Sequence, residues 1–160
     1  MEAVYRMAAM KDFIIIGNAN AAISKNVFPL FKDGKVRFGY SKRGMDFDTD
    51  EGVKNINAVW YVTFPVKRKP LILTQRYSPA KYPKYDNYDA IEVSKVSDIP
   101  YDYGGVMGVP ITFLDKWCEG FEIVGVLYGE YTEIDGEYIK GHMPFLNGEP
   151  KYSRLLIKRK

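Results

Sequence analysis

The chain has 160 residues, of which 46% are hydrophobic and 27% charged, with a net charge of +3. This length suffices for one sizeable core, and the composition is that of a soluble globular protein, which excludes wholesale disorder. The sequence has neither a run of eighteen apolar residues nor the pattern of a secretory signal. A single cysteine, Cys118, and a single histidine, His142, exclude an internal disulfide, a Cys-rich zinc site and most His-based catalysis. We therefore expect a cytoplasmic protein without a membrane span or a metal site.

Charge is segregated along the chain. Residues 1–85 carry 15 Lys and Arg against 7 Asp and Glu, residues 86–137 carry 2 against 12, and residues 138–160 carry 6 against 1. Such segregation can give a basic face that meets a polyanion and an acidic face that repels one. If the blocks interleave after folding, their charges cancel instead, and the sequence is compatible with both arrangements.

The first forty residues show the alternation of helices and strands that is typical of an α/β sheet. Residues 2–10 carry an apolar stripe among good helix formers and predict a short helix. Residues 13–16, a continuous apolar run ending at Gly17, predict a strand buried on both faces, as in a parallel sheet. Apolar residues recur at helical spacing over 21–31, and alternation over 36–40 predicts a second strand.

The rest of the chain is expected to contain more strands and loops than helices. Residues 41–56 are rich in glycine and acidic residues and predict a polar loop, which residues 58–64 follow as a third strand. Residues 65–110 contain six prolines but many tyrosines, which favours an ordered, loop-rich segment. We expect three segments: a partial α/β core at 1–64, a basic and aromatic segment at 65–110, and, at 111–160, terminal strands with hairpin turns at Asp135-Gly136 and Asn147-Gly148.

Three groups of residues are candidates for a functional site. One is a set of cations that lie among tyrosines with no acid nearby, a pattern that suits phosphate contacts and base stacking but also an ordinary solvated loop: Lys67, Arg68, Lys69, Arg76, Lys81 and Lys84. Asn18 and Asn20 follow the first apolar strand, where ligand crevices form, although a helix cap explains them equally well. The acidic run from Asp46 to Glu51 lacks the spacing of a calcium loop, so we expect no metal there.

Longer strings in the sequence are more specific than these motifs. They are FIIIGNANA at 13–21, VFPLFKDGKVRFGY at 27–40, KYPKYDNYDAIEV at 81–93, DIPYDYGGVMGVPITFLDKW at 98–117, FEIVG at 121–125 and the ending YSRLLIKRK. In this order they resemble the EcoRI-type adenine-specific DNA methyltransferases over nearly the whole chain. The glycines of the fourth string predict a tight structural turn: Gly104, Gly105 and Gly108.

The resemblance implies transfer of a methyl group from S-adenosylmethionine to the N6 amine of adenine in double-stranded DNA, with the target base extruded into a pocket. It implies an α/β fold, namely the C-terminal part of a Rossmann-like methyltransferase sheet with a loop-rich region that recognises DNA. On this basis Asn18 and Asn20 line the active-site crevice, and the six cations contact DNA. Trp60 and Tyr61 are base-stacking candidates, and the core is expected to take one of them because neighbours on a strand face opposite ways.

Two signatures of that family are missing from this sequence. One is the Asn/Asp-Pro-Pro-aromatic tetrapeptide that holds the adenine amine, since the chain contains no Pro-Pro pair; the other is the glycine-bearing cofactor motif. We therefore expect this chain to be part of a restriction-modification enzyme, with no catalytic residues of its own. By itself it should be inactive and should not hold the cofactor. Its expected partner is double-stranded DNA. The sequence is equally compatible with a truncated gene product, with a gene whose start is assigned too late and with one part of a split enzyme, and in the last case a separate N-terminal methyltransferase half is a further partner. The alternatives are a non-catalytic DNA-binding module derived from such an enzyme and a protein-binding domain that uses the acidic block at 86–137.

Overall fold

The structure is a computed structural model that describes residues 12–40, 44–116, 119–129, 131–141 and 143–160. It divides into two compact units, Met1–Arg68 and Lys69–Lys160. The helix predicted over residues 2–10 lies outside the described residues, as do Cys118 and His142. Among the described residues, the helices are too short and too polar to cross a membrane.

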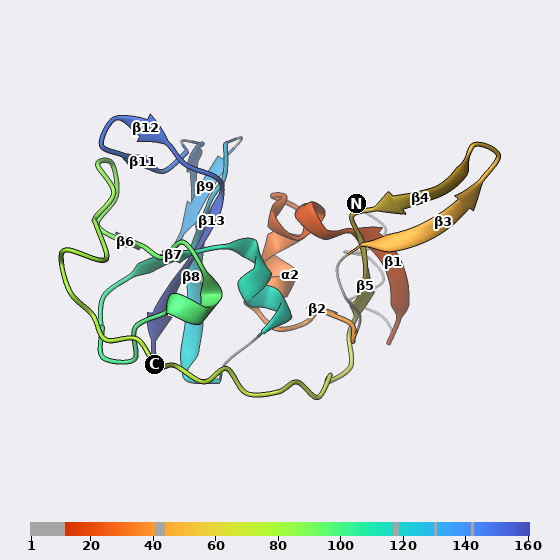
Figure 1. The fold of residues 1–160 in the computed structure, drawn as a ribbon, viewed down its shortest axis with the longest axis horizontal. Helices are drawn as coiled ribbons and strands as arrows, with labels where there is room; N and C mark the ends of the chain where they lie inside the picture. Colours follow the sequence, from red (N-terminus) through yellow and green to blue (C-terminus); the bar gives the residue numbers. More distant parts are fainter. Residues whose placement is uncertain (1–11, 41–43, 117–118, 130, 142) are drawn as a thin grey trace. The chain divides into compact units, whose positions relative to one another are not determined.

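The first unit is built on a three-stranded antiparallel sheet with the order β1-β5-β2 (Figure 1). Strand β5 (Ala58–Val62) lies between β1 (Ile14–Asn18) and β2 (Arg37–Phe38). The 3-10 helix η1 (Ala19–Ile23) and the helix α2 (Phe28–Lys32) connect β1 to β2. The rings of Phe31, Phe38 and Tyr61 meet with centroids 4.9 to 5.6 Å apart, so an aromatic cluster fastens α2 to one face of the sheet.

The prediction that β1 is buried on both faces of a parallel sheet is wrong. Strand β1 runs antiparallel to β5 at the edge of the sheet, and Ile14 and Ile16 are 57% and 49% exposed. The apolar run correctly indicated a strand. It could not indicate the direction or position of that strand, because the apolar content of a short run does not depend on its neighbours.

The segment expected to be a polar loop at 41–56 contains a hairpin instead. Strand β3 (Met45–Thr49) pairs with β4 (Gly52–Ile56), and the Thr49 hydroxyl donates a 2.6 Å hydrogen bond to the Gly52 carbonyl at the turn. Acidic residues made this segment resemble a loop. However, Met45 and Phe47 alternate with aspartates, which is the two-residue period of a strand.

The second unit contains a six-stranded mixed sheet with the order β10-β9-β8-β13-β7-β6 (Figure 1). Its long antiparallel pair is β8 (Phe121–Leu127) with β13 (Arg154–Arg159). The hairpin of β9 (Tyr131–Ile134) and β10 (Glu137–Lys140) extends one side, and β7 (Met107–Val109) and β6 (Ile91–Glu92), which run parallel, extend the other. The described fold is therefore α/β and consists mostly of strands.

Short elements complete the second unit. They are the hairpin of β11 (Phe145–Leu146) and β12 (Glu149–Pro150) and the 3-10 helices η2 (Val96–Asp98) and η3 (Ile111–Asp115). Both predicted hairpin turns are confirmed: Asp135-Gly136 joins β9 to β10, and Asn147-Gly148 joins β11 to β12. All four residues have φ between 51° and 90°, the left-handed region that two-residue hairpin loops require.

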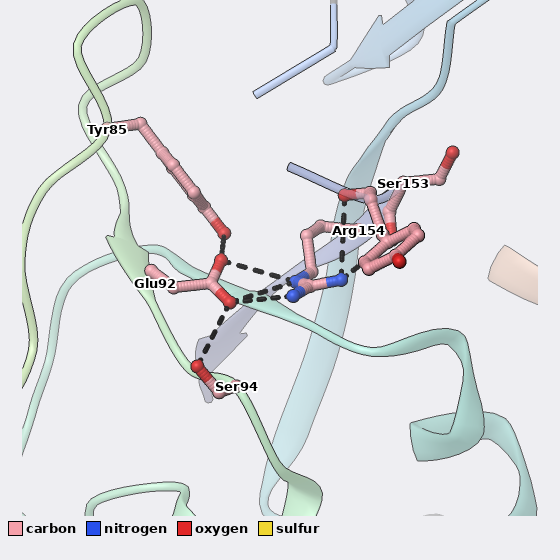
Figure 2. A network of polar contacts seen from close by, with 6 residues as sticks. Tyr85, Glu92, Ser94, Ser153 and Arg154 are labelled. Atoms are coloured by element: carbon pink, nitrogen blue, oxygen red, sulfur yellow. Dashed lines mark hydrogen bonds and ion pairs between the residues drawn. The ribbon is translucent and has the colours of Figure 1, made fainter. Parts of the chain in front are cut away.

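A buried ion pair joins two strands that are not neighbours in this sheet. Glu92 on β6 and Arg154 on β13 are 6% and 8% exposed. Nη2 of Arg154 donates to Oε1 of Glu92 at 2.7 Å, and Nε lies 3.2 Å from both carboxylate oxygens (Figure 2). Because a buried charge is tolerated only when it is paired and hydrogen-bonded, each of these residues depends on the other.

Neighbouring polar groups satisfy the rest of this pair (Figure 2). The hydroxyl of Tyr85 donates to Oε2 of Glu92, and the hydroxyl of Ser94 lies 3.4 Å from Oε1. Nη1 of Arg154 donates to the carbonyl of Ser153 at 3.3 Å. Burial, together with the bond to Glu92, raises the pKa of Tyr85 well above its usual range, so its hydroxyl remains a donor at any physiological pH.

Gly108 makes room for this network. It lies in β7, opposite Glu92 of β6 on one side and Leu156 of β13 on the other. A Cβ atom at this position would overlap the hydroxyl of Tyr85. The prediction of a tight turn is therefore wrong for Gly108, which is part of a strand and provides space rather than an unusual backbone angle.

Breaking the buried pair should destabilise the second unit severely. We expect Arg154→Met to lower the free energy of unfolding by about 3–5 kcal/mol, because it leaves the Glu92 carboxylate buried without its partner. Urea denaturation followed by circular dichroism measures this change. Asp33→Asn is the matched control because it breaks the exposed Asp33–Lys35 pair, and it should cost no more than about 1 kcal/mol. Equal losses in the two variants would contradict this account.

Candidate nucleic-acid interface

The basic and aromatic stretch predicted to contact DNA folds against the block at 98–105. Gln75 forms an isolated parallel bridge with Pro100, and the N–H of Tyr101 donates to the Gln75 carbonyl at 2.9 Å. These contacts join two segments of the second unit that are well separated in sequence. We call the surface formed by residues 75–82 and 98–105 the loop surface.

Three tyrosines stiffen the loop surface. The ring of Tyr77 contacts those of Tyr103 and Tyr82, with centroid distances of 4.5 and 5.9 Å. Tyr82 is buried, and its hydroxyl donates to the Asp98 carbonyl at 2.8 Å. Burial raises the pKa of Tyr103, and the nearby Tyr77 adds to this effect, so the Tyr103 hydroxyl stays protonated at neutral pH. The tyrosines therefore form a stack that fixes the 75–82 loop rather than a set of mobile surface rings.

Asp102 holds the start of the 75–82 loop through contacts with Arg76 and Tyr77. Its Oδ1 accepts a 2.7 Å hydrogen bond from the N–H of Tyr77, and its Oδ2 lies 3.3 Å from Nε of Arg76. The Arg76 side chain is 82% exposed. One carboxylate thus fixes both the backbone of the loop and the base of its arginine.

The first three predicted cations differ in their contacts. Lys67 and Lys69 are exposed, and within the described part of the chain neither has a hydrogen-bond or ion-pair partner. Arg68 is half-buried, and its guanidinium donates to the carbonyls of Phe38 and Gly39, the latter at 3.4 Å. Arg68 therefore ties the end of the first unit to the β2 region, which is a structural role.

The other lysines of the set have partners in the second unit. Nζ of Lys84 lies 2.7 Å from Oδ1 of Asp89, a contact that raises the pKa of Lys84 and lowers the pKa of Asp89. Nζ of Lys81 donates to Oε1 of Gln75 and lies 5.4 Å from the centroid of the Tyr82 ring. Both lysines are exposed, so water screens these contacts and a phosphate can compete for them.

The two predicted crevice asparagines lie where β1 ends and η1 begins. Oδ1 of Asn18 accepts the N–H of Asn20 at 2.8 Å, which caps η1, and the Asn18 carbonyl accepts the Tyr61 hydroxyl at 2.5 Å. Both asparagines are exposed. The helix cap accounts for Asn18, while the side chain of Asn20 is presented to solvent.

Trp60 and Tyr61 face opposite sides of β5. Tyr61 is 1% exposed and packs against Phe31 and Phe38, whereas Trp60 is 37% exposed and lies opposite Ile16 of β1. The core therefore takes Tyr61, whose ring is not available to stack on a base in this fold. Trp60 is the ring left at the surface.

Sequence reasoning missed Asp102, Gln75 and Tyr103. Gln75 lies in the basic and aromatic segment, and Asp102 and Tyr103 lie in the string at 98–117. Nothing in their spacing shows that 75–77 and 100–103 meet. The bridge between Gln75 and Pro100 is isolated and has no periodic pattern that would predict it. The one sign in the sequence was that Asp102 and Tyr103 lie within the string at 98–117 that resembles the family.

A separate hollow of about 350 Å³ lies on a face of the six-stranded sheet. Its lining includes the apolar residues Val106, Val124 and Leu156, the acidic residues Asp89, Glu122 and Asp135, and one basic residue, Lys158. Because acidic residues outnumber the one lysine and carboxylates repel phosphate, this hollow is not suited to contact the backbone of a nucleic acid. The loop surface, with its exposed Arg76 and Lys81, is the better candidate.

Substitution of Trp60 and of Tyr61, neighbours on β5, should show which of the two lies in the core and which at the surface. We expect Tyr61→Ala to lower the free energy of unfolding by about 3–5 kcal/mol, as removal of a buried aromatic ring does. Trp60→Ala should cost about 1 kcal/mol, since its ring is partly solvated. Chemical denaturation of both variants checks this, and a larger loss for Trp60→Ala would show that the assignment of faces is wrong.

Comparison with known proteins gives consistent matches. The family model for adenine-specific methyltransferase EcoRI matches residues 3–160. The chain is 38% identical to the type II methyltransferase M.EcoRI of Escherichia coli, over 94% of this chain and 51% of that protein. It is 30% identical to M.MpnI of Mycoplasma pneumoniae and 31% identical to M.MgeORF184P of Mycoplasma genitalium, over 57% of each. The chain thus spans about half the length of these relatives, and no solved structure gives a significant match.

Proposed function

We propose that this chain, which belongs to the EcoRI family of adenine-specific methyltransferases, is the C-terminal portion of a site-specific DNA adenine N6-methyltransferase. The complete enzyme is of restriction-modification type and takes its methyl group from S-adenosylmethionine. The family match supports the class of reaction. The loop surface supports contact with DNA as the role of this chain, because its exposed cations and packed tyrosines suit such contact.

The exposed lysines near the boundary between the units contact phosphates in this proposal. Lys67 and Lys69 have no partner among the described residues, so they can bind phosphate without first breaking an ion pair. Neutralised phosphates release counterions, which supplies affinity that does not depend on sequence. Lys81 and Lys84 add to this contact when phosphate replaces Gln75 or Asp89.

The first unit contributes to the active-site crevice of the complete enzyme. Asn20 and the exposed ring of Trp60 are the residues best placed to touch an extruded adenine, by a hydrogen bond and by stacking, while Asn18 shapes the turn that holds Asn20. The exposed Ile14 and Ile16 on edge strand β1 support docking of a separate N-terminal methyltransferase half, since an apolar edge strand is normally covered. The strands of this unit are then the last part of a Rossmann-like sheet.

The residues at the end of β1 do not fit S-adenosylmethionine. The glycine at the end of the apolar strand, Gly17, does not face an open cradle, because a Cβ atom there would lie 2.8 Å from the ring of Tyr61. The amide oxygen of Asn18 is already used to cap η1. The proposal therefore assigns the cofactor and the Asn/Asp-Pro-Pro-aromatic tetrapeptide to the N-terminal half, and no step of methyl transfer to residues of this chain.

Salt-dependent DNA binding tests the proposed function. We expect the chain to bind duplex DNA at about 50 mM salt and to lose affinity steeply at higher salt. Replacing Lys67 and Lys69 with Ala should weaken binding equally for all DNA sequences and should reduce the slope of log affinity against log salt by about 2, one for each lost phosphate contact. Fluorescence anisotropy with several duplexes measures both effects.

Lys95→Ala is the matched control for this experiment. Lys95 is also exposed, but it lies in the acidic block and should leave affinity and slope unchanged. Absence of DNA binding at about 50 mM salt would overturn the proposed function. If the double lysine variant kept the original slope, these two lysines would not be phosphate contacts.

A further inference from the structure

Arg76 is held differently from Lys81, the other cation of the loop surface. Asp102 binds its Nε, at 3.3 Å, and within the described residues Nη1 and Nη2 have no partner. The two Nη groups and their fork of N–H donors are therefore available to a ligand, while the base of the guanidinium is fixed. The side chain is 82% exposed, so nothing in the second unit blocks access to the fork.

The grip of Asp102 on the loop limits where this fork can point. The same carboxylate accepts the N–H of Tyr77 at 2.7 Å, so side chain and backbone at positions 76 and 77 are fixed to one group. The ring of Tyr77 in turn packs against those of Tyr82 and Tyr103. An arginine normally loses much rotamer freedom on binding, and these contacts remove part of that loss before any ligand arrives.

An ordinary surface ion pair has a different geometry. Arginine and carboxylate groups often pair through two parallel hydrogen bonds, which occupy the fork. Here one oxygen of Asp102 is used by the backbone of Tyr77 and the other by Nε of Arg76. This arrangement uses only the Nε donor of the arginine, so its main effect is to fix the orientation of the guanidinium.

We propose that Arg76, positioned by Asp102, reads a guanine in the major groove by donating two hydrogen bonds from its guanidinium to O6 and N7. This inference rests on the proposed function, since it requires that the chain contact DNA. Guanine presents two acceptors in the plane and at the spacing that an arginine fork matches, whereas a phosphate contact needs no such orientation. Lys67 and Lys69, which lack comparable positioning, supply affinity, and Arg76 supplies specificity for one base pair.

Selection of duplexes from a random library by the full chain tests this inference. The wild-type chain should enrich sequences that share a G·C pair, and a duplex in which that pair is replaced should bind about 5- to 150-fold more weakly. Arg76→Lys keeps the charge but loses the fork, so it should lose this preference at that one position while its salt slope stays unchanged. Asp102→Asn should weaken the preference at the same position, again with an unchanged slope.

Controls separate this inference from the proposed function. Lys69→Ala should weaken binding to all duplexes equally and keep the preference for guanine, and unfolding curves should show that Arg76→Lys folds as the wild type does. An Arg76→Lys chain that keeps the wild-type preference at every position overturns the inference, as does a wild-type chain that binds DNA without selecting guanine. Both of these results leave DNA contact standing, whereas failure to bind any duplex overturns both proposals.

Discussion

The buried ion pair between Glu92 and Arg154 is the interaction on which the second unit depends most. It joins β6 to β13 across β7, and Gly108 of β7 leaves the space it needs. The backbone of Glu92 is tied to the region next to the loop surface, because its N–H donates to the Pro83 carbonyl at 2.8 Å, directly after the 75–82 loop. Asp102 binds the start of the same loop through the N–H of Tyr77.

The charge segregation of the sequence has two consequences in the structure. Acidic residues of the 86–137 block pair with basic residues of the preceding block, as Asp102 does with Arg76 and Asp89 with Lys84. These contacts cancel part of the charge, as the interleaved arrangement requires. They also orient Arg76 and Lys84, so an acidic block that would repel DNA by itself helps to position two of the cations proposed to bind it.

Local patterns predicted the elements better than their arrangement. The apolar run of β1, the alternation of β2 and both hairpin turns follow from periodicity and turn chemistry, which act over a few residues. The edge position of β1 and the antiparallel pairing with β5 depend on residues some forty positions away. In the same way, the basic and aromatic pattern predicted a role for Arg76, but its partner Asp102 comes from the meeting of two irregular segments. The burial of Tyr61 rather than Trp60 depends on which face of the sheet α2 covers.

In the proposed function this chain contributes contact with DNA, and the chemistry of methyl transfer belongs to the N-terminal half. The decisive measurement is transfer of labelled methyl groups from S-adenosylmethionine to duplex DNA, by the chain alone and by the chain mixed with an N-terminal polypeptide that carries the Asn/Asp-Pro-Pro-aromatic tetrapeptide. We expect background transfer by the chain alone and clear transfer by the mixture. Transfer by the chain alone at the rate of an intact enzyme of this family would contradict this expectation.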